Sequence, residues 1–170
     1  IFVFDPAPLL ADVRVGQRVR VTGTVTETFN QTQVNATAVV NCGDTAVVTP
    51  TQVNLPFASA AFAERYEGML ITMSQTLTVT EVFNLGRFGE AVLSSGGRLY
   101  IPTNVVEPGA PANAQQAAND LNRVILDDGL SIQNPDPTPY MFDEPTLRVG
   151  DSVTGLTGVL GYGFSAYRIQ

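Results

Sequence analysis

Leu147-Arg148-Val149-Gly150-Asp151-Ser152-Val153 is the stretch that decides the fold, because an earlier stretch repeats its pattern. That earlier stretch is Val13-Arg14-Val15-Gly16-Gln17-Arg18-Val19. A shift of 134 residues superposes Arg14 on Arg148, and four further positions match in the same register. Both copies then continue to an aromatic residue, Phe29 or Phe164. A Val-Gly turn before a strand is a common motif, but the matches in register favour one structural unit that is used twice.

Composition excludes several classes of function. The chain has 170 residues, 44% of them hydrophobic, which is enough for one or two small packed domains. It contains no His, so a Ser-His-Asp triad, a Cys-His pair and a His metal site are excluded within it. Cys42 is the single cysteine, which excludes an internal disulfide and a Cys-rich zinc site. No apolar run approaches the ~20 residues that span a bilayer, so we expect no membrane partner.

Alternating apolar and polar residues predict strands along most of the chain. Residues 13–28 carry Val on one side and Arg or Thr on the other, with Gly23 as an expected bulge. Two helices are expected, one at 57–67 and a clearer one near 112–122, and four prolines predict a loop or lid over 133–145. Further strands are expected at 1–5, 32–40, 46–48, 69–83, 90–93, 98–101 and 123–126, and a pair of strands after Gly150.

The order of these segments predicts a mostly β fold of OB-like Greek-key barrels with one or two short helices. Residues 56–170 contain the strands of one complete barrel. Residues 1–55 supply only the later strands of a first barrel, since Ile1-Phe2-Val3-Phe4-Asp5 corresponds loosely to Val124-Ile125-Leu126-Asp127. Because the chain opens inside an apolar run and without Met, we expect it to be a piece of a longer protein. Whether earlier residues complete the first barrel is left open by the sequence.

Several strings resemble a known family. They are Arg65-Tyr66-Glu67-Gly68-Met69-Leu70, Asn84-Leu85-Gly86-Arg87-Phe88-Gly89-Glu90, Tyr100-Ile101-Pro102-Thr103-Asn104-Val105 and the Leu147–Asp151 segment. They resemble the accessory region of secreted bacterial extracellular nucleases of the ExeM/NucH type. The resemblance implies a secreted protein with a covalently linked, metal-dependent nuclease domain C-terminal to Gln170. It also implies that the divalent metal belongs to that domain, so we expect no cofactor and no catalytic residue in this chain.

Two loops are candidate nucleic-acid sites, because OB barrels bind single strands by stacking bases on aromatic side chains and pairing phosphates with Arg. The first loop carries Phe83, Arg87 and Phe88, whose rings would otherwise close a hairpin by cross-strand packing. The second loop lies between the last two strands and is equally consistent with a glycine-rich hairpin of core aromatics. It carries Tyr162, Phe164, Tyr167 and Arg168.

Two further charged sets are weaker candidates. Arg14, Arg18 and Arg20 form a positive row that could follow a phosphate backbone, although a charged strand edge that resists pairing explains it more simply. Asp127 and Asp128 could bind calcium, although an Asp-Asp-Gly turn is commoner.

The sequence therefore predicts a non-catalytic OB region that guides DNA, single-stranded or duplex, to a separate nuclease domain. The net charge of −7 argues against strong non-specific binding, so contacts must come from a local Arg and aromatic patch. Two other functions remain open. The region is a scaffold that packs on the catalytic domain, or it is a module that binds carbohydrate or a surface.

Overall fold

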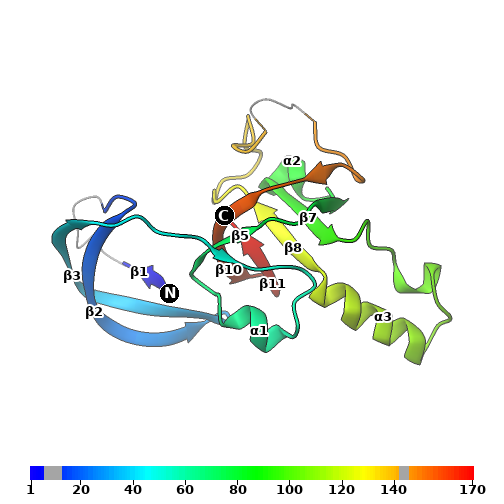
Figure 1. Cartoon of the computed structure of the whole chain (residues 1–170), viewed down its shortest axis with the longest axis horizontal. Helices are drawn as coiled ribbons and strands as arrows, with labels where there is room; N and C mark the ends of the chain where they lie inside the picture. Colours follow the sequence, from blue (N-terminus) through cyan, green and yellow to red (C-terminus); the bar gives the residue numbers. More distant parts are fainter. Residues whose placement is uncertain (6–12, 142–145) are drawn as a thin grey trace.

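The computed structural model describes residues 1–5, 13–141 and 146–170. The fold is mostly β, with 41% strand and 15% helix, as the sequence predicts. One sheet has three strands in the order β1-β3-β2, and the other has eight in the order β4-β5-β10-β11-β8-β7-β6-β9. Figure 1 shows the smaller sheet, in blue and cyan, beside the larger one. No helix among the described residues is long and apolar enough to cross a membrane.

The larger sheet curls into a partial barrel. Strands β5 and β6 lie near opposite ends of its order, yet only residues 74–76 separate them along the chain. Strand β11 pairs in parallel with β8 and antiparallel with β10, which gives the Greek-key crossover expected for an OB-like barrel. The strands are β4 (Thr51–Gln52), β5 (Leu70–Met73), β6 (Leu77–Glu81), β7 (Glu90–Ser95), β8 (Arg123–Asp127), β9 (Ser152–Val153), β10 (Leu156–Gly163) and β11 (Ala166–Ile169).

The smaller sheet repeats the pairing of the barrel's last strands. It contains β1 (Phe2–Phe4), β2 (Gln17–Thr28) and β3 (Gln31–Thr45). Strand β1 runs parallel to β3, and β2 runs antiparallel to β3, just as β8 and β10 flank β11. The register of β2 on β3 shifts between Thr22 and Gly23, which confirms the expected bulge.

The repeated turns match in their hydrogen bonds. The Arg14 amide donates to the Gln17 side chain, and the Arg148 amide donates to the Asp151 side chain, each at 2.7 Å. Between them, Gly16 and Gly150 have φ of 90° and 100°, which side chains other than glycine rarely adopt. The two units are therefore alike in strand pairing and in turn geometry.

One apolar core fills the barrel. Alternate residues of β5, β6, β7 and β8 point inward, and Ile71, Leu77, Leu93 and Val124 are almost completely buried there. Burial of such side chains contributes roughly 1.5–3 kcal/mol each, so this core makes the barrel a rigid platform for its loops.

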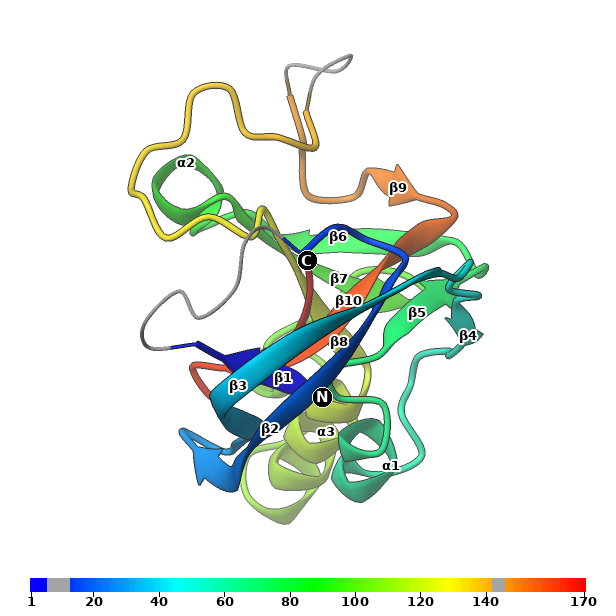
Figure 2. The ribbon, with the colours of Figure 1, turned by 90° about the vertical axis from the view of Figure 1, so that its left-hand side faces the viewer.

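Three α-helices interrupt the strands in the described part of the chain. Helix α1 (Ala60–Glu64) begins at Ser59, whose hydroxyl accepts from the Phe62 amide, and is shorter than the helix expected at 57–67. Helix α3 (Ala110–Leu121) lies where the helix near 112–122 is predicted and precedes β8. Figure 2 shows α1 and α3 close together in that view. The other helices are α2 (Leu85–Phe88) and the 3-10 turn η1 (Pro102–Asn104).

Some expected elements are absent. No strand forms at 98–101, because Gly96 and Gly97 turn the chain with positive φ and the Leu99 amide donates to the Thr80 hydroxyl instead of a strand. No strand forms at 46–48 either, where Val47 is almost fully exposed. The expected loop at 133–145 is free of helix and strand as far as residue 141, and residues 142–145 lie outside the described part of the chain.

Candidate nucleic-acid interface

The centre of the candidate site is the outer face of β7, β8 and β11. Val92 pairs with Ile125 across β7 and β8, and their inward neighbours Leu93 and Val124 belong to the core. Val92, Ile125 and Ala166 line one small cavity on this face, with a volume of about 150 Å³. The centre of the face is therefore apolar, with Glu81, Glu90 and Arg123 around it, and buried residues support it from beneath.

The two predicted loops meet at this cavity, whose lining includes both Phe83 and Phe164. Phe83 comes from the segment between β6 and β7, and Phe164 from the turn between β10 and β11. Their exposed fractions are 87% and 94%, so neither ring serves the core. The structure therefore brings together two aromatic candidates that lie far apart in the sequence.

The cavity continues into larger ones at both ends. Arg123 lines three cavities, and the largest of these three, about 500 Å³, extends past β8 toward α1. On the other side a cavity of about 480 Å³ reaches Tyr100, over whose ring the Arg98 guanidinium lies at 5.2 Å. We call this continuous surface, from Tyr100 through Arg123 to Tyr167, the groove.

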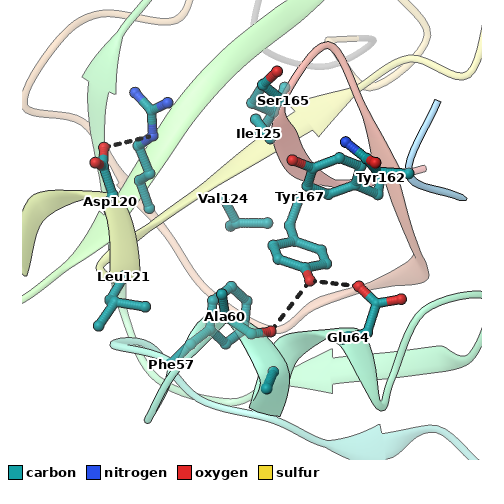
Figure 3. Close-up of a pocket in the computed structure, with 14 residues that line it drawn as sticks. Phe57, Ala60, Glu64, Asp120, Leu121, Val124, Ile125, Tyr162, Ser165 and Tyr167 are labelled. Atoms are coloured by element: carbon teal, nitrogen blue, oxygen red, sulfur yellow. Dashed lines mark hydrogen bonds and ion pairs between the residues drawn. The ribbon is translucent and has the colours of Figure 1, made fainter. Parts of the chain in front are cut away.

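Tyr162 and Tyr167 form the wall of the groove that Figure 3 shows. Their ring centroids are 5.0 Å apart, and Tyr167 also packs edge-on against Phe57 at 5.7 Å. The Tyr167 hydroxyl lies within hydrogen-bond distance of the Ala60 carbonyl and the Glu64 carboxylate, and it donates the bond. Burial, followed by the nearby Glu64 carboxylate, raises the pKa of Tyr167. Both tyrosines are half-buried, so they shape the groove more than they project into it.

Arg168 lies on the same outer face but is buried. Its guanidinium is paired with Glu90 at 2.8 Å and with Asp127, and it donates to the Gly163 carbonyl at 2.9 Å. The same guanidinium lies 5.4 Å from the Phe164 ring. These contacts make Arg168 a positioning residue that holds the turn carrying Phe164, and they leave little of it for a phosphate.

Arg87 and Phe88 sit on α2 at the edge of the site. The Arg87 guanidinium lies 5.1 Å from the Phe88 ring and donates to the Gln133 side chain at 3.3 Å. Arg87 is exposed, so it remains reachable by a ligand that passes Phe83.

The two weaker sets lie elsewhere. Arg14, Arg18 and Arg20 are exposed on β2 and the turn before it, in the first sheet and not on the barrel face. Asp127 and Asp128 accept from the Gly129 and Leu130 amides at 2.7 and 2.9 Å, as residues of a turn do. Among the described residues, no group of three or more His, Cys, Asp or Glu side chains could hold a metal ion.

The charges of the groove are mixed. Glu64, Glu81 and Asp120 line it alongside Arg98 and Arg123. Arg123 and Asp120 are 3.9 Å apart and both substantially exposed, a pairing that contributes little. A ligand of this groove therefore gains more from stacking and apolar contact than from net charge.

Sequence reasoning missed three residues of the groove, Arg98, Tyr100 and Arg123, and also Phe29, which lines a further cavity beside Tyr162 and Phe164. The strand that the sequence predicts at 98–101 does not indicate that Arg98 and Tyr100 lie near Arg123. Phe29 could have been found, because the repeat makes it the counterpart of Phe164.

Comparison with known proteins identifies a family. Residues 49–170 match the family described as "Domain of unknown function (DUF8508)", and because this is more than half of the chain, the chain belongs to that family. Searches of the curated proteins and of the solved structures found no significant match to this chain.

Proposed function

We propose that this member of the DUF8508 family is a non-catalytic binding region that holds single-stranded nucleic acid in the groove. The observation that carries the proposal is the pair of exposed rings, Phe83 and Phe164, at one cavity on the β7–β8–β11 face. In OB folds this face and these two loops are where single strands bind. Each base stacked on an aromatic ring contributes roughly 1–3 kcal/mol.

The phosphates of a bound strand have partners beside the rings. Arg123 lies in the middle of the groove and Arg98 toward one end, while Arg87 is exposed on α2 outside the groove. Because the chain as a whole carries a charge of −7, these contacts are local and the affinity should fall with salt. In the parent protein that the sequence resemblance implies, such binding would guide DNA to a linked metal-dependent nuclease domain.

Titration of a labelled oligothymidylate of about 12 nucleotides, followed by fluorescence anisotropy, tests the proposal. We expect binding that weakens between about 50 and about 200 mM salt, and a loss of about 5- to 150-fold in affinity for Phe83→Ala. Phe83 is 87% exposed, so the substitution leaves stability unchanged. The matched control is Val47→Ala, also almost fully exposed but not part of the groove, which should bind as the unsubstituted chain does. Absence of binding at the lower salt would contradict the nucleic-acid proposal and favour the alternative role of a scaffold that packs on a catalytic domain.

A neutral oligosaccharide is the second candidate ligand. The carboxylates of Glu64 and Glu81 in the groove favour it, because they repel phosphates but accept hydrogen bonds from hydroxyl groups. Titration with a β-linked glucose oligomer separates the two. Saccharide binding that is indifferent to salt and absent with oligothymidylate would replace the nucleic-acid proposal.

A further inference from the structure

Two phenylalanines occupy equivalent turns in the two repeated units. Phe29 (φ 53°) and Asn30 (φ 61°) connect β2 to β3, and Phe164 (φ 50°) and Ser165 (φ 62°) connect β10 to β11. Two-residue turns with both φ positive favour Asn or Gly, and a bulky side chain is strained there. Each unit thus keeps a Phe where local backbone preference opposes it.

Burial does not explain these two residues. Phe29 is 91% exposed and Phe164 is 94% exposed, so neither ring recovers the conformational cost by burial. Both rings instead line one cavity of about 540 Å³ between the two units. Strained, exposed aromatic residues that face a shared cavity indicate a ligand site.

The rest of the cavity wall is polar but uncharged. Gln31, Gln33 and Asn30 contribute amides, which can donate and accept hydrogen bonds, and Tyr162 contributes a third ring. No Arg, Asp or Glu side chain lines this cavity among the described residues. The chemistry suits a flat, uncharged ring with hydrogen-bonding edges, which describes a nucleobase and not a phosphate.

We propose that Phe29 and Phe164 form an aromatic clamp, meaning these two residues and the cavity between them, which stacks a base of the strand bound in the groove. This inference rests on the proposed function. Phe164 lines both this cavity and the one that contains Phe83, so one strand can pass from Phe83 to Phe164 and on to Phe29. The first unit then contributes directly to binding, although its sheet has only three strands.

A tryptophan reporter tests the clamp without reference to activity. The chain has no Trp, so Phe29→Trp introduces a single tryptophan, whose ring can still stack and whose emission can be excited apart from that of the five Tyr. We expect saturable quenching of its fluorescence by oligothymidylate of about 12 nucleotides. The matched control is Val47→Trp, whose position is 95% exposed and outside the cavity lining, and its emission should not change.

Affinities measured by anisotropy separate the two proposals. We expect Phe29→Ala to weaken binding about 5- to 150-fold, whereas Val25→Ala, an exposed position on the same hairpin, should not weaken it. If Phe83→Ala weakens binding but Phe29→Ala and the Phe29→Trp emission do not respond, the clamp is refuted and the groove stands. If the unsubstituted chain does not bind oligothymidylate, both the nucleic-acid proposal for the groove and the aromatic clamp are refuted. A response of Phe29→Trp to a β-linked glucose oligomer alone would refute the base as the occupant.

Discussion

At the scale of single residues, Phe29 and Phe164 are the clearest case of a residue type that its own backbone conformation disfavours. Both have φ near 50°, and both are more than nine-tenths exposed. A left-handed residue other than glycine costs about 1–2 kcal/mol, and Asn tolerates this conformation better than Phe does. Stability alone would therefore not select Phe at position 29, whereas at position 164 the Arg168 guanidinium, 5.4 Å from the ring, offsets part of the cost.

Replacing Phe29 by Asn should consequently stabilise the chain while it weakens binding. We expect the free energy of unfolding to rise by about 0.5–1 kcal/mol, measured by urea denaturation. Val25→Asn, an exposed strand position on the same hairpin, is the control and should not stabilise. A clear loss of stability in Phe29→Asn would mean that the ring is a structural residue after all.

The limits of sequence reasoning also appear at this scale. Phe83 and Phe164 could be predicted as candidates because each lies in a glycine-containing segment between two expected strands. Whether a ring points into the core or into solvent could not be predicted, since alternation is lost outside strands. The same limit applies to Arg168, where the partner carboxylates of Glu90 and Asp127 come from distant strands.

At the scale of elements, β7, β8 and β11 are joined on their outer face by Arg168, Glu90 and Asp127. The Tyr140 hydroxyl donates to the Gly89 carbonyl at 2.8 Å beside this cluster. Burial, followed by Asp128 and Asp127, raises the pKa of Tyr140, so the hydroxyl keeps its proton. The cluster therefore fixes one end of the binding face.

Arg168→Met should be strongly destabilising, because it leaves the buried carboxylate of Asp127 and the largely buried carboxylate of Glu90 without their cation. The expected loss in the free energy of unfolding is about 3–5 kcal/mol, measured by chemical denaturation. Arg98→Met, which removes an exposed guanidinium, serves as the control and should change stability by less than about 0.5 kcal/mol. Equal effects of the two substitutions would show that Arg168 does not hold the three strands together.

Helices and strands whose apolar residues recur with a clear period were predictable from the sequence. Elements that depend on tertiary contacts were not. The strands at 17–28 and 123–127 and the helix at 110–121 follow from alternation and helical spacing. Helix α2 was missed because four residues are too few to show a period. It is closed by Gly89, which has φ of 63° and donates to the Leu85 carbonyl.

At the scale of the whole molecule, Glu67 connects the first sheet to the barrel. Its carboxylate accepts from the Thr32 amide of β3 at 3.1 Å, and the adjacent Gly68 carbonyl accepts from the nitrogen of Ile1. Burial, followed by the carboxylate of Glu64 and a smaller effect of Glu27, raises the pKa of Glu67 from 4.5 to about 7. Folding therefore favours the protonated form of this carboxyl.

The resulting pH dependence has a definite sign. Between pH 4.5 and about 7 the folded chain binds more protons at Glu67 than the unfolded chain does, so stability falls as pH rises through this range. Because the group is partly exposed, we expect an effect on the order of 1 kcal/mol. Glu67→Gln should flatten the profile of stability against pH, whereas Glu107→Gln at an exposed position should leave it unchanged. A slope that survives in Glu67→Gln would assign the effect to other groups.

The most direct test of the groove is to map where a single strand binds. Amide proton and nitrogen NMR spectra would be recorded while oligothymidylate of about 12 nucleotides is added at about 50 mM salt. The predicted result is that the largest shifts fall on residues 83–88 and 163–166 and on Val92 and Ile125, with smaller ones at Phe29. Spectra that do not change, or shifts confined to Arg14, Arg18 and Arg20 on the first sheet, would contradict binding on the β7–β8–β11 face.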